Sequence, residues 1–129
     1  MKKIKIKTAF RDNRGSIKDL FYKERINHVA HIITKKKGVI RGNHYHKKTT
    51  QFIYIVSGSL NYWYKKFHSS KKAMMIRVFK GEIVKTPPYE IHALTFDEKN
   101  EFIVFSKGLR GGKDYEKDTF RVAPINKHN

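Results

Sequence analysis

The sequence predicts an all-β domain whose strands form a sandwich or barrel. Short segments rich in β-branched and aromatic residues follow one another along most of the 129 residues, with turn residues between them at close and regular intervals. Aromatic residues make up 13% of the chain, which favours strands over a helical bundle. No internal repeat, linker or low-complexity segment divides the sequence, so residues 1–129 are expected to form a single domain.

The individual strands are predicted from alternating patterns that end at turn residues. They are expected at residues 28–34, 51–57, 60–64, 74–79, 82–86, 92–96 and 101–106. Pro87-Pro88 cannot donate ladder hydrogen bonds, so the sheet is expected to be interrupted or to reach an edge there. Only Ile17 to Glu24 has a helical pattern, although this stretch could also be irregular. The polar, glycine-bearing tail from Gly108 to Asn129 is expected to wrap the surface or a partner subunit.

Charge is the most unusual bulk property of the chain. The chain has 29 Lys and Arg against 11 Asp and Glu, a formal net charge of +18 that attracts anionic partners. No zinc-knuckle spacing, helix-turn-helix pattern or basic helix is present, so nucleic acid is not the expected partner. We interpret the scattered lysines as a solvated surface, and a phosphate-bearing small substrate suits the charge equally well.

The absence of cysteine and of long apolar runs narrows the class of protein. Without cysteine, disulfides and thiolate chemistry are excluded. No run approaches the roughly 18 apolar residues that a membrane span needs. The basic, alternating start from Met1 to Lys7 has no apolar signal-peptide core after it. We therefore expect a cytoplasmic protein with no membrane partner.

Two short stretches concentrate residues with acid-base and metal-binding chemistry. His44 and His46 are two residues apart, so on a strand their imidazoles point to the same face. His92 follows the rigid turn at Pro87-Pro88. Three converging histidines could bind a divalent metal, or could hold a substrate and move protons. The other histidines lie outside these two stretches and are interpreted as surface or packing residues: His28, His31, His68 and His128.

The spacing of both stretches resembles the paired signature of the cupin superfamily. Residues 38–58 match Gly-x5-His-x-His-x3,4-Glu-x6-Gly at every position, with Gln51 in place of the glutamate. Residues 81–92 match Gly-x5-Pro-x-Gly-x2-His apart from Tyr89, which replaces the second glycine, and Phe96 replaces the asparagine that follows. The resemblance implies a double-stranded β-helix, the jelly-roll barrel of the cupins.

Within the cupins, the N-terminal half of the chain resembles the sugar 3,4-ketoisomerases. The matching motifs are Asp-x-Arg-Gly-Ser at residues 12–16 and Arg-Gly-x-His-x-His-Lys at residues 41–47, followed by Gln51. That family acts on thymidine-diphosphate 4-keto-6-deoxy sugars. The chain is also similar to the 3,5-epimerases of the rhamnose pathway and, through residues 42–46 and 118–120 among others, to the cupin domain of capsular-polysaccharide reductases. All three imply a role in making deoxy sugars for surface polysaccharide.

Gln51 favours the ketoisomerases among these families. The capsular cupin keeps the glutamate and binds zinc, whereas the ketoisomerases have glutamine and work without metal. A neutral amide oxygen is also a poorer metal ligand than a carboxylate. No cofactor is therefore expected to be required. A divalent metal such as zinc, if bound, would have His44, His46, Gln51 and His92 as ligands. The strand at 102–105 lacks the tyrosine that acts as the acid in the 3,5-epimerases. Tyr115 remains a candidate for that role.

The ketoisomerase resemblance implies a role for each candidate residue. His44 and His46 would shuttle protons between two sugar carbons, because imidazole titrates near physiological pH. Arg41 would bind a phosphate or stabilise an enediolate oxygen, or would only anchor the turn at Gly42. The further substrate-binding candidates are Arg14, Lys47, Gln51, Tyr54, Trp63 and His92. Two of these residues also have a structural alternative. Trp63 could be a core residue, and Arg14 could belong to a turn that closes the barrel.

The expected partners follow from the same resemblance. They are a nucleotide-diphosphate sugar, expected to be dTDP-linked, and a second copy of the chain in a homodimer. A cupin that binds a sugar, a nucleotide sugar or a metal without catalysis is the alternative function.

Overall fold

The computed structural model describes residues 1–127, and nearly all of its regular structure is β-strand. The strands are β1 (Lys2–Lys5), β2 (Thr8–Asp12), β3 (Gly15–Lys18), β4 (His28–Thr34), β5 (Ile40–Tyr45), β6 (Thr50–Ser57), β7 (Ser59–Lys66), β8 (Met74–Phe79), β9 (Glu82–Thr86), β10 (Glu90–Thr95), β11 (Asn100–Lys107) and β12 (Phe120–Arg121). A short 3₁₀-helix, η1 (Gly112–Asp114), precedes β12. The described chain has no helix that is long and apolar enough to cross a membrane.

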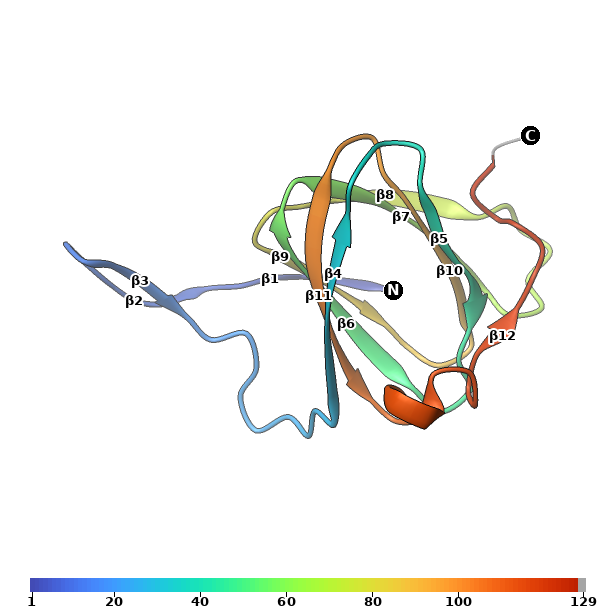
Figure 1. Ribbon diagram of the computed structural model, residues 1–129, viewed down its shortest axis with the longest axis horizontal. Coiled ribbons are helices and arrows are strands. Elements are labelled where there is room, and N and C mark those ends of the chain that lie inside the picture. Colours follow the sequence, from blue (N-terminus) through green and yellow to red (C-terminus); the bar gives the residue numbers. More distant parts are fainter. Residues whose placement is uncertain (128–129) are drawn as a thin grey trace.

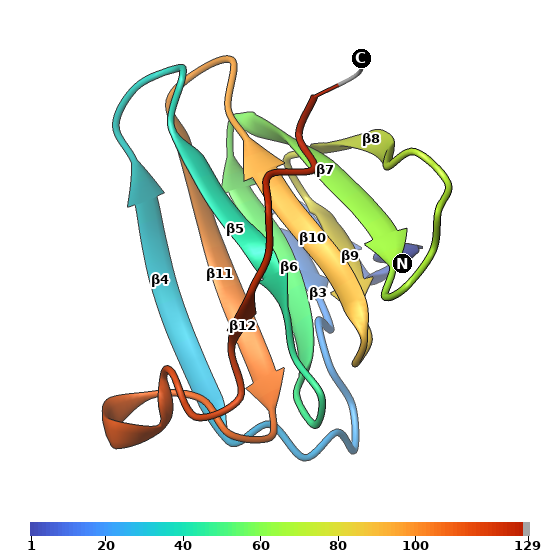
Figure 2. The ribbon, with the colours of Figure 1, turned by 90° about the vertical axis from the view of Figure 1, so that its right-hand side faces the viewer.

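Two five-stranded antiparallel sheets face each other (Figure 2). One has the strand order β1-β9-β6-β11-β4 and the other the order β12-β5-β10-β7-β8. From β4 to β11 the chain passes repeatedly from one sheet to the other, which is the connectivity of a jelly roll. The all-β, jelly-roll prediction is confirmed. The sheet is also interrupted at Pro87-Pro88, between β9 and β10.

Most predicted strands lie where the alternating patterns place them. β4, β8 and β9 have the predicted bounds. β6 differs from them by one residue at its start, and β7, β10 and β11 differ by one or two residues at each end. The helical pattern at Ile17–Glu24 is not realised, because Gly15–Lys18 pairs with β2 and residues 19–27 are irregular. An isolated helix of this length is unstable in water without a packed face, and here Ile17 is exposed.

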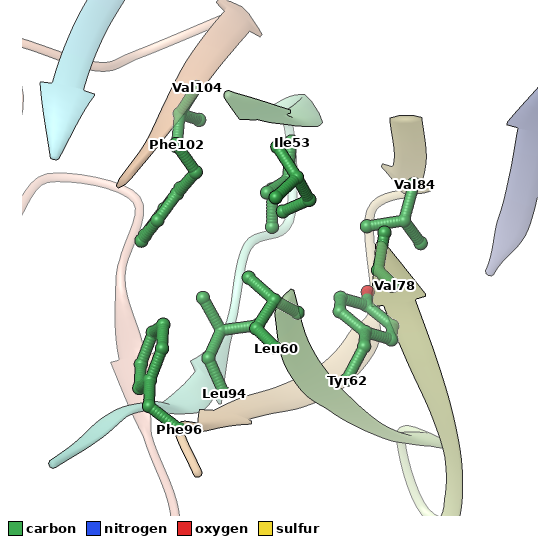
Figure 3. Close-up of a cluster of buried hydrophobic side chains, with 10 residues drawn as sticks. Ile53, Leu60, Tyr62, Val78, Val84, Leu94, Phe96, Phe102 and Val104 are labelled. Atoms are coloured by element: carbon green, nitrogen blue, oxygen red, sulfur yellow. The ribbon is translucent and has the colours of Figure 1, made fainter. Parts of the chain in front are cut away.

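The hydrophobic core lies between the two sheets. Figure 3 shows side chains from both sheets that converge there, among them Ile53 of β6, Leu60 of β7, Leu94 of β10 and Phe102 of β11. Each of these side chains is almost completely removed from water, which stabilises the fold by roughly 1.5–3 kcal/mol per side chain. The core fills one part of the barrel, and polar side chains occupy the interior beyond it.

Two segments lie outside the central strands β4 to β11. The hairpin of β2 and β3 projects away from the barrel (Figure 1), and its Phe10 and Ile17 are exposed. At the other end of the chain, β12 pairs with β5, and the Val122 amide donates to the Asn43 carbonyl at 3.0 Å. The described part of the tail, up to Lys127, therefore lies along its own barrel.

Candidate functional site

Strands β5 and β10 place two of the site histidines opposite each other. His44 of β5 pairs with His92 of β10, and the register shifts directly after this pair, between His92 and Ala93. Gly42 makes the close approach of the strands possible, because a Cβ on it would lie 2.8 Å from the His92 carbonyl oxygen. Its φ of 87° is also one that glycine adopts readily.

His46 completes a cluster of three imidazoles. Its ring centroid lies 4.9 Å from that of His44 and 5.4 Å from that of His92, and the other two centroids are 4.7 Å apart. One ring nitrogen of each residue lies within 4.8 Å of the others. His46 and His92 are buried and His44 is partly buried. The barrel thus brings all three imidazoles to one point in its interior.

Backbone carbonyls hold two of these rings in one tautomer. The Nδ1 of His46 donates to the carbonyl of Asp118 at 2.7 Å, and the Nδ1 of His92 donates to the carbonyl of Glu90 at 3.1 Å. Since a carbonyl oxygen only accepts, Nδ1 carries the hydrogen and Nε2 keeps its lone pair. Nε2 of His46 and Nδ1 of His44 are buried and have no hydrogen-bond partner among the described residues. These nitrogens are available to a bound ligand.

Burial keeps the imidazoles neutral. Loss of hydration, and then the neighbouring imidazoles, lower the pKa of His44 to about 2 and that of His92 to about 3. Burial also lowers the pKa of His46, against the opposing effects of the Asp118 carbonyl and the Gln51 amide. The positive charge of Arg110 lowers all three pKa values further. At neutral pH each ring can therefore accept a proton or a metal ion.

A cavity of about 220 Å³, here called the histidine cavity, opens in front of His44 and His92. Arg41, Gln51 and Arg110 line it beside the two histidines, and its other walls are apolar. A neighbouring cavity of about 290 Å³, here called the outer cavity, shares Gln51 and Arg110 with it. His28, His31, Ser106 and Tyr115 add the remaining polar groups of the outer cavity. No carboxylate of the described residues lines either cavity.

Of the substrate-binding residues predicted from the sequence, Arg41 and Gln51 lie in this site together with His92. Gln51 is buried on β6. The Nε of Arg41 donates to Thr34 Oγ1 at 3.1 Å, and its Nη2 donates to the Ile33 carbonyl at 3.2 Å. Arg41 thus anchors the end of β4 and faces the histidine cavity at the same time.

The other predicted substrate-binding residues do not line either cavity of their own chain. Arg14 lies on the projecting hairpin, where Nε and Nη2 donate to Asp12 Oδ2 at 2.9 and 2.7 Å. The ammonium of Lys47 lies 4.2 Å from the ring centroid of Phe120. Two more candidates are on strands that contribute to the core. Tyr54 is a neighbour of the inward-facing Ile53 and so lies on the opposite face of β6, and Trp63 is buried with its Nε1 donating to Thr95 Oγ1 at 3.0 Å.

Two site residues that sequence reasoning missed come from the segment after β11. Arg110 lines both cavities. Asp118 is buried, and its carboxylate accepts hydrogen bonds from the amides of Lys47 and Lys48, each at 2.9 Å, and from Thr49 Oγ1 at 2.7 Å. Although burial raises the pKa of Asp118, these donors lower it overall. The only sequence signal was the match of residues 118–120 to the capsular cupins, which assigned no role to Asp118.

The remaining histidines have varied surroundings. His28 lines the outer cavity with its ring centroid 5.6 Å from that of Tyr115. His31 also lines this cavity, and its Nε2 lies 2.6 Å from Glu101 Oε1. His68 is exposed and packs on Phe67. His128 lies outside the described residues.

The donor atoms of the cluster fit a divalent metal. Three nitrogen ligands lie within 4.8 Å of one another, and two of the rings have a buried nitrogen without a partner among the described residues. A zinc site offers such a set of ligands before the metal binds. The charge around the cluster disfavours a cation. Arg41 and Arg110 line the same cavity, and Gln51 in the position of a fourth ligand is neutral. The charge of the cavity therefore favours an anion.

Comparison with protein families gives one match. Residues 10–119 match the family model described as the polysaccharide biosynthesis C-terminal domain. No curated protein sequence matches the chain significantly.

Several solved structures resemble the chain over most of its length. A double mutant of the 3,4-ketoisomerase QdtA from Thermoanaerobacterium thermosaccharolyticum, in complex with TDP, has 23% identity and a TM-score of 0.76 over 94% of this chain and 86% of that one. The TDP-quinovose 3,4-ketoisomerase WlaRB from Campylobacter jejuni has 20% identity and a TM-score of 0.76, over 94% and 92%. The dTDP-4-dehydrorhamnose 3,5-epimerase from Sulfolobus tokodaii has 19% identity and a TM-score of 0.67, over 80% and 68%. This likeness confirms the predicted cupin fold.

Proposed function

The chain belongs to the family of polysaccharide biosynthesis C-terminal domains, and we propose that it isomerises a 4-keto-6-deoxy sugar carried on a nucleoside diphosphate. One observation carries the proposal: neutral imidazoles and two guanidinium groups face one cavity that no described carboxylate lines. Such a site suits a ligand that is anionic and that must lose and regain a proton. The similarity in fold to ketoisomerases solved with TDP supports this choice of substrate.

The proposed reaction moves a carbonyl group from C4 to C3 of the sugar. A base removes the proton on C3, which leaves an enediolate with its negative charge on the C4 oxygen. The proton of the C3 hydroxyl then passes to the C4 oxygen, a proton returns to C4, and the C3 oxygen becomes the ketone. His44 and His46 would carry these protons, because each has a buried ring nitrogen with no hydrogen-bond partner among the described residues. A bound anionic substrate would also raise the low pKa values of the imidazoles, since negative charge stabilises the imidazolium form.

The other residues of the cavity have proposed roles in binding. Arg41 would stabilise the enediolate oxygen or hold a phosphate, because its guanidinium has no carboxylate partner among the described residues. Gln51 and His92 would orient the sugar. The reaction would then require no cofactor.

Replacing the two histidines tests the proposal. His44→Asn and His46→Asn should each lower turnover of dTDP-4-keto-6-deoxyglucose by roughly 10²- to 10⁴-fold, the usual contribution of a general acid or base. NMR spectroscopy in D₂O would follow deuterium entry at C3 and C4 and the appearance of the 3-ketone. His68→Asn is the matched control, because His68 is exposed and its φ of 64° suits asparagine. A wild-type protein that leaves this sugar and related 4-keto sugars unchanged would contradict the proposal.

A metal-binding cupin is the second candidate function, and the imidazole cluster favours it. A divalent metal held by His44, His46 and His92, with Gln51 as a further ligand, would supply Lewis acidity to a bound sugar. Elemental analysis of the purified protein separates the two candidates. Stoichiometric metal that is lost in His92→Gln would support the metal centre, whereas full turnover after chelation would support the metal-free isomerase.

We also propose that the chain forms a homodimer. The hairpin of β2 and β3 exposes two large apolar side chains away from the barrel, and the described residues of its own chain leave more than half of each uncovered. β1 already pairs with β9 of the same chain, so the hairpin is the N-terminal element left to contact a second copy. A substrate-binding role for Arg14 would require this second copy, because Arg14 lines neither cavity of its own chain.

A further inference from the structure

We infer that Arg110 binds an oxyanion of the ligand at the junction of the histidine cavity and the outer cavity. The nature of that ligand rests on the function proposed above, but the anion site itself does not. Arg110 lies just after β11, outside every motif found in the sequence, and it lines both cavities. Gln51 is the other polar residue that lines both cavities.

The side chain of Arg110 is held in place through one of its nitrogens. Nη1 donates to the Tyr115 carbonyl at 2.8 Å and to Thr119 Oγ1 at 3.1 Å, and the guanidinium lies 5.2 Å from the Tyr115 ring centroid. Among residues 1–127, no atom accepts a hydrogen bond from Nε or Nη2. These contacts fix the guanidinium and leave two of its nitrogens free to donate to a ligand.

Arg110 forms no ion pair within the described chain. Its guanidinium is half-buried, and no described carboxylate lies within ion-pair distance of it. Arg77 and Arg121, in contrast, pair with Asp97 and Glu116 at 2.9 and 2.8 Å. Removing an unpaired charge from water is costly, and a bound oxyanion offsets that cost through charge-assisted hydrogen bonds.

The oxyanion can come from two parts of one ligand. Arg110 donates a hydrogen bond to the sugar if its free nitrogens point into the histidine cavity, where an enediolate oxygen would develop beside His44. It meets the diphosphate if it donates toward the outer cavity, where His28 and His31 add further donors. The chemistry is the same in both cases, and binding and turnover measurements separate them.

Two substitutions of Arg110, with a matched control, test the inference. Arg110→Gln removes the charge and keeps a donor for the Tyr115 carbonyl, and Arg110→Lys restores the charge. Arg121→Gln is the control, because Arg121 lies on β12 of the same segment and is already paired. Calorimetric titration would measure the affinity for pyrophosphate and for dTDP, and steady-state kinetics would measure kcat and KM on dTDP-4-keto-6-deoxyglucose. Circular dichroism would verify that each variant is folded.

Each source of the oxyanion predicts its own result. If Arg110 binds the diphosphate, Arg110→Gln should weaken pyrophosphate and dTDP binding by roughly 10- to 100-fold, as expected for a hydrogen bond to a charged group, and Arg110→Lys should recover part of the loss. If it binds the enediolate oxygen, both affinities and KM should stay unchanged while kcat falls by a similar factor.

Wild-type affinity and wild-type turnover in Arg110→Gln would overturn the inference. Binding of pyrophosphate that depends on Arg110, in a protein that leaves the sugar unchanged, would support the anion site and contradict the isomerase. A wild-type protein that neither binds these anions nor acts on the sugar would contradict both.

Discussion

His92 is buried between a backbone carbonyl and an aromatic ring, and its neutral form is favoured by this burial. Its Nδ1 donates to the Glu90 carbonyl, and its ring is stacked at 6.2 Å from that of Tyr62. Burial raises the pKa of Tyr62 well above its usual value, so the phenol stays protonated and donates to Glu90 Oε2 at 2.7 Å. His92 is therefore packed against neutral groups, and its Nε2 keeps its lone pair.

The low pKa of His92 makes the stability of the fold depend on pH. In the unfolded chain a histidine titrates near 6.5, whereas burial lowers the pKa of folded His92 to about 3. Between these values the unfolded state binds more protons, so the stabilisation is complete above about pH 6.5 and is lost as the pH falls toward 3.

Replacing His92 should reduce this pH dependence. Between pH 7.5 and pH 5.0 the unfolding free energy of the wild type should fall by about 2 kcal/mol more than that of His92→Gln, as linkage predicts for one histidine with such a shift. Urea unfolding at both pH values measures the difference. Carboxylates contribute little there, because their unfolded pKa values lie near 4. Equal losses in the two proteins would show that His92 is not held neutral, and His68→Gln serves as the exposed-histidine control.

Tyr89 shows why one departure from the cupin motif leaves the site intact. The motif has glycine at this position, and Tyr89 has a φ of 62°, the left-handed region in which glycine is favoured. Its amide donates to the His46 carbonyl at 2.7 Å, and its ring lies 6.0 Å from that of Phe67. The backbone geometry that the motif requires is preserved, and aromatic packing helps to offset its cost.

At the scale of elements, the segment from Gly108 to Phe120 completes the site. Its Asp118 binds the backbone just after β5, and the carbonyl of the same residue accepts from His46. Because one buried residue makes both contacts, the position of this segment and the orientation of the His46 ring are coupled.

Asp118→Asn should loosen this attachment. We expect a loss of about 1–3 kcal/mol in unfolding free energy, because an amide removes the charge and presents only one acceptor oxygen to the donors at residues 47–49. The ¹⁵N shifts of the His46 ring should also move toward a mixture of tautomers. Urea unfolding and imidazole NMR spectroscopy measure the two effects. Asp114→Asn is the control, since Asp114 is only partly buried and pairs with nearby Lys117 at 2.8 Å. Unchanged stability and tautomer in Asp118→Asn would refute the coupling.

At the scale of the whole molecule, the projecting hairpin and the positive charge are its most unusual features. The +18 charge steers anionic ligands toward the protein in general, whereas Arg41 and Arg110 place positive charge inside the site itself. The exposed hairpin, with Phe10 and Ile17 at 52% and 58% exposure, is the apolar surface that the proposed homodimer would cover.

The proposed homodimer predicts a mass of about twice 15.3 kDa in solution. Light scattering coupled to size-exclusion chromatography measures it. Substituting Phe10 and Ile17 together with serine should shift the protein toward the monomer, because the apolar contact area is lost. Met74→Ser, which changes a comparably exposed apolar residue on the barrel, should not. A wild-type protein that elutes with the mass of one chain would contradict the dimer.

Several features of the fold and of the site follow from local rules alone. Alternation with a period of two marked most of the strands, and the i,i+2 spacing placed His44 and His46 on one face. Motif spacing identified the cupin barrel, and it added Arg41, Gln51 and His92 to the candidate site. Local patterns did not mark the hairpin strands β2 and β3, whose apolar residues face no core of their own chain.

Local patterns could not predict which strands pair or which residues reach the site from a distance. His92 faces His44 because β10 pairs with β5, and Asp118 and Arg110 reach the site because the tail crosses the barrel. Lys47 and Tyr54 lie close in sequence to His46 and Gln51, yet they line neither cavity. The physical reason is that a strand pattern separates its two faces, whereas long-range pairing and burial decide what each face meets.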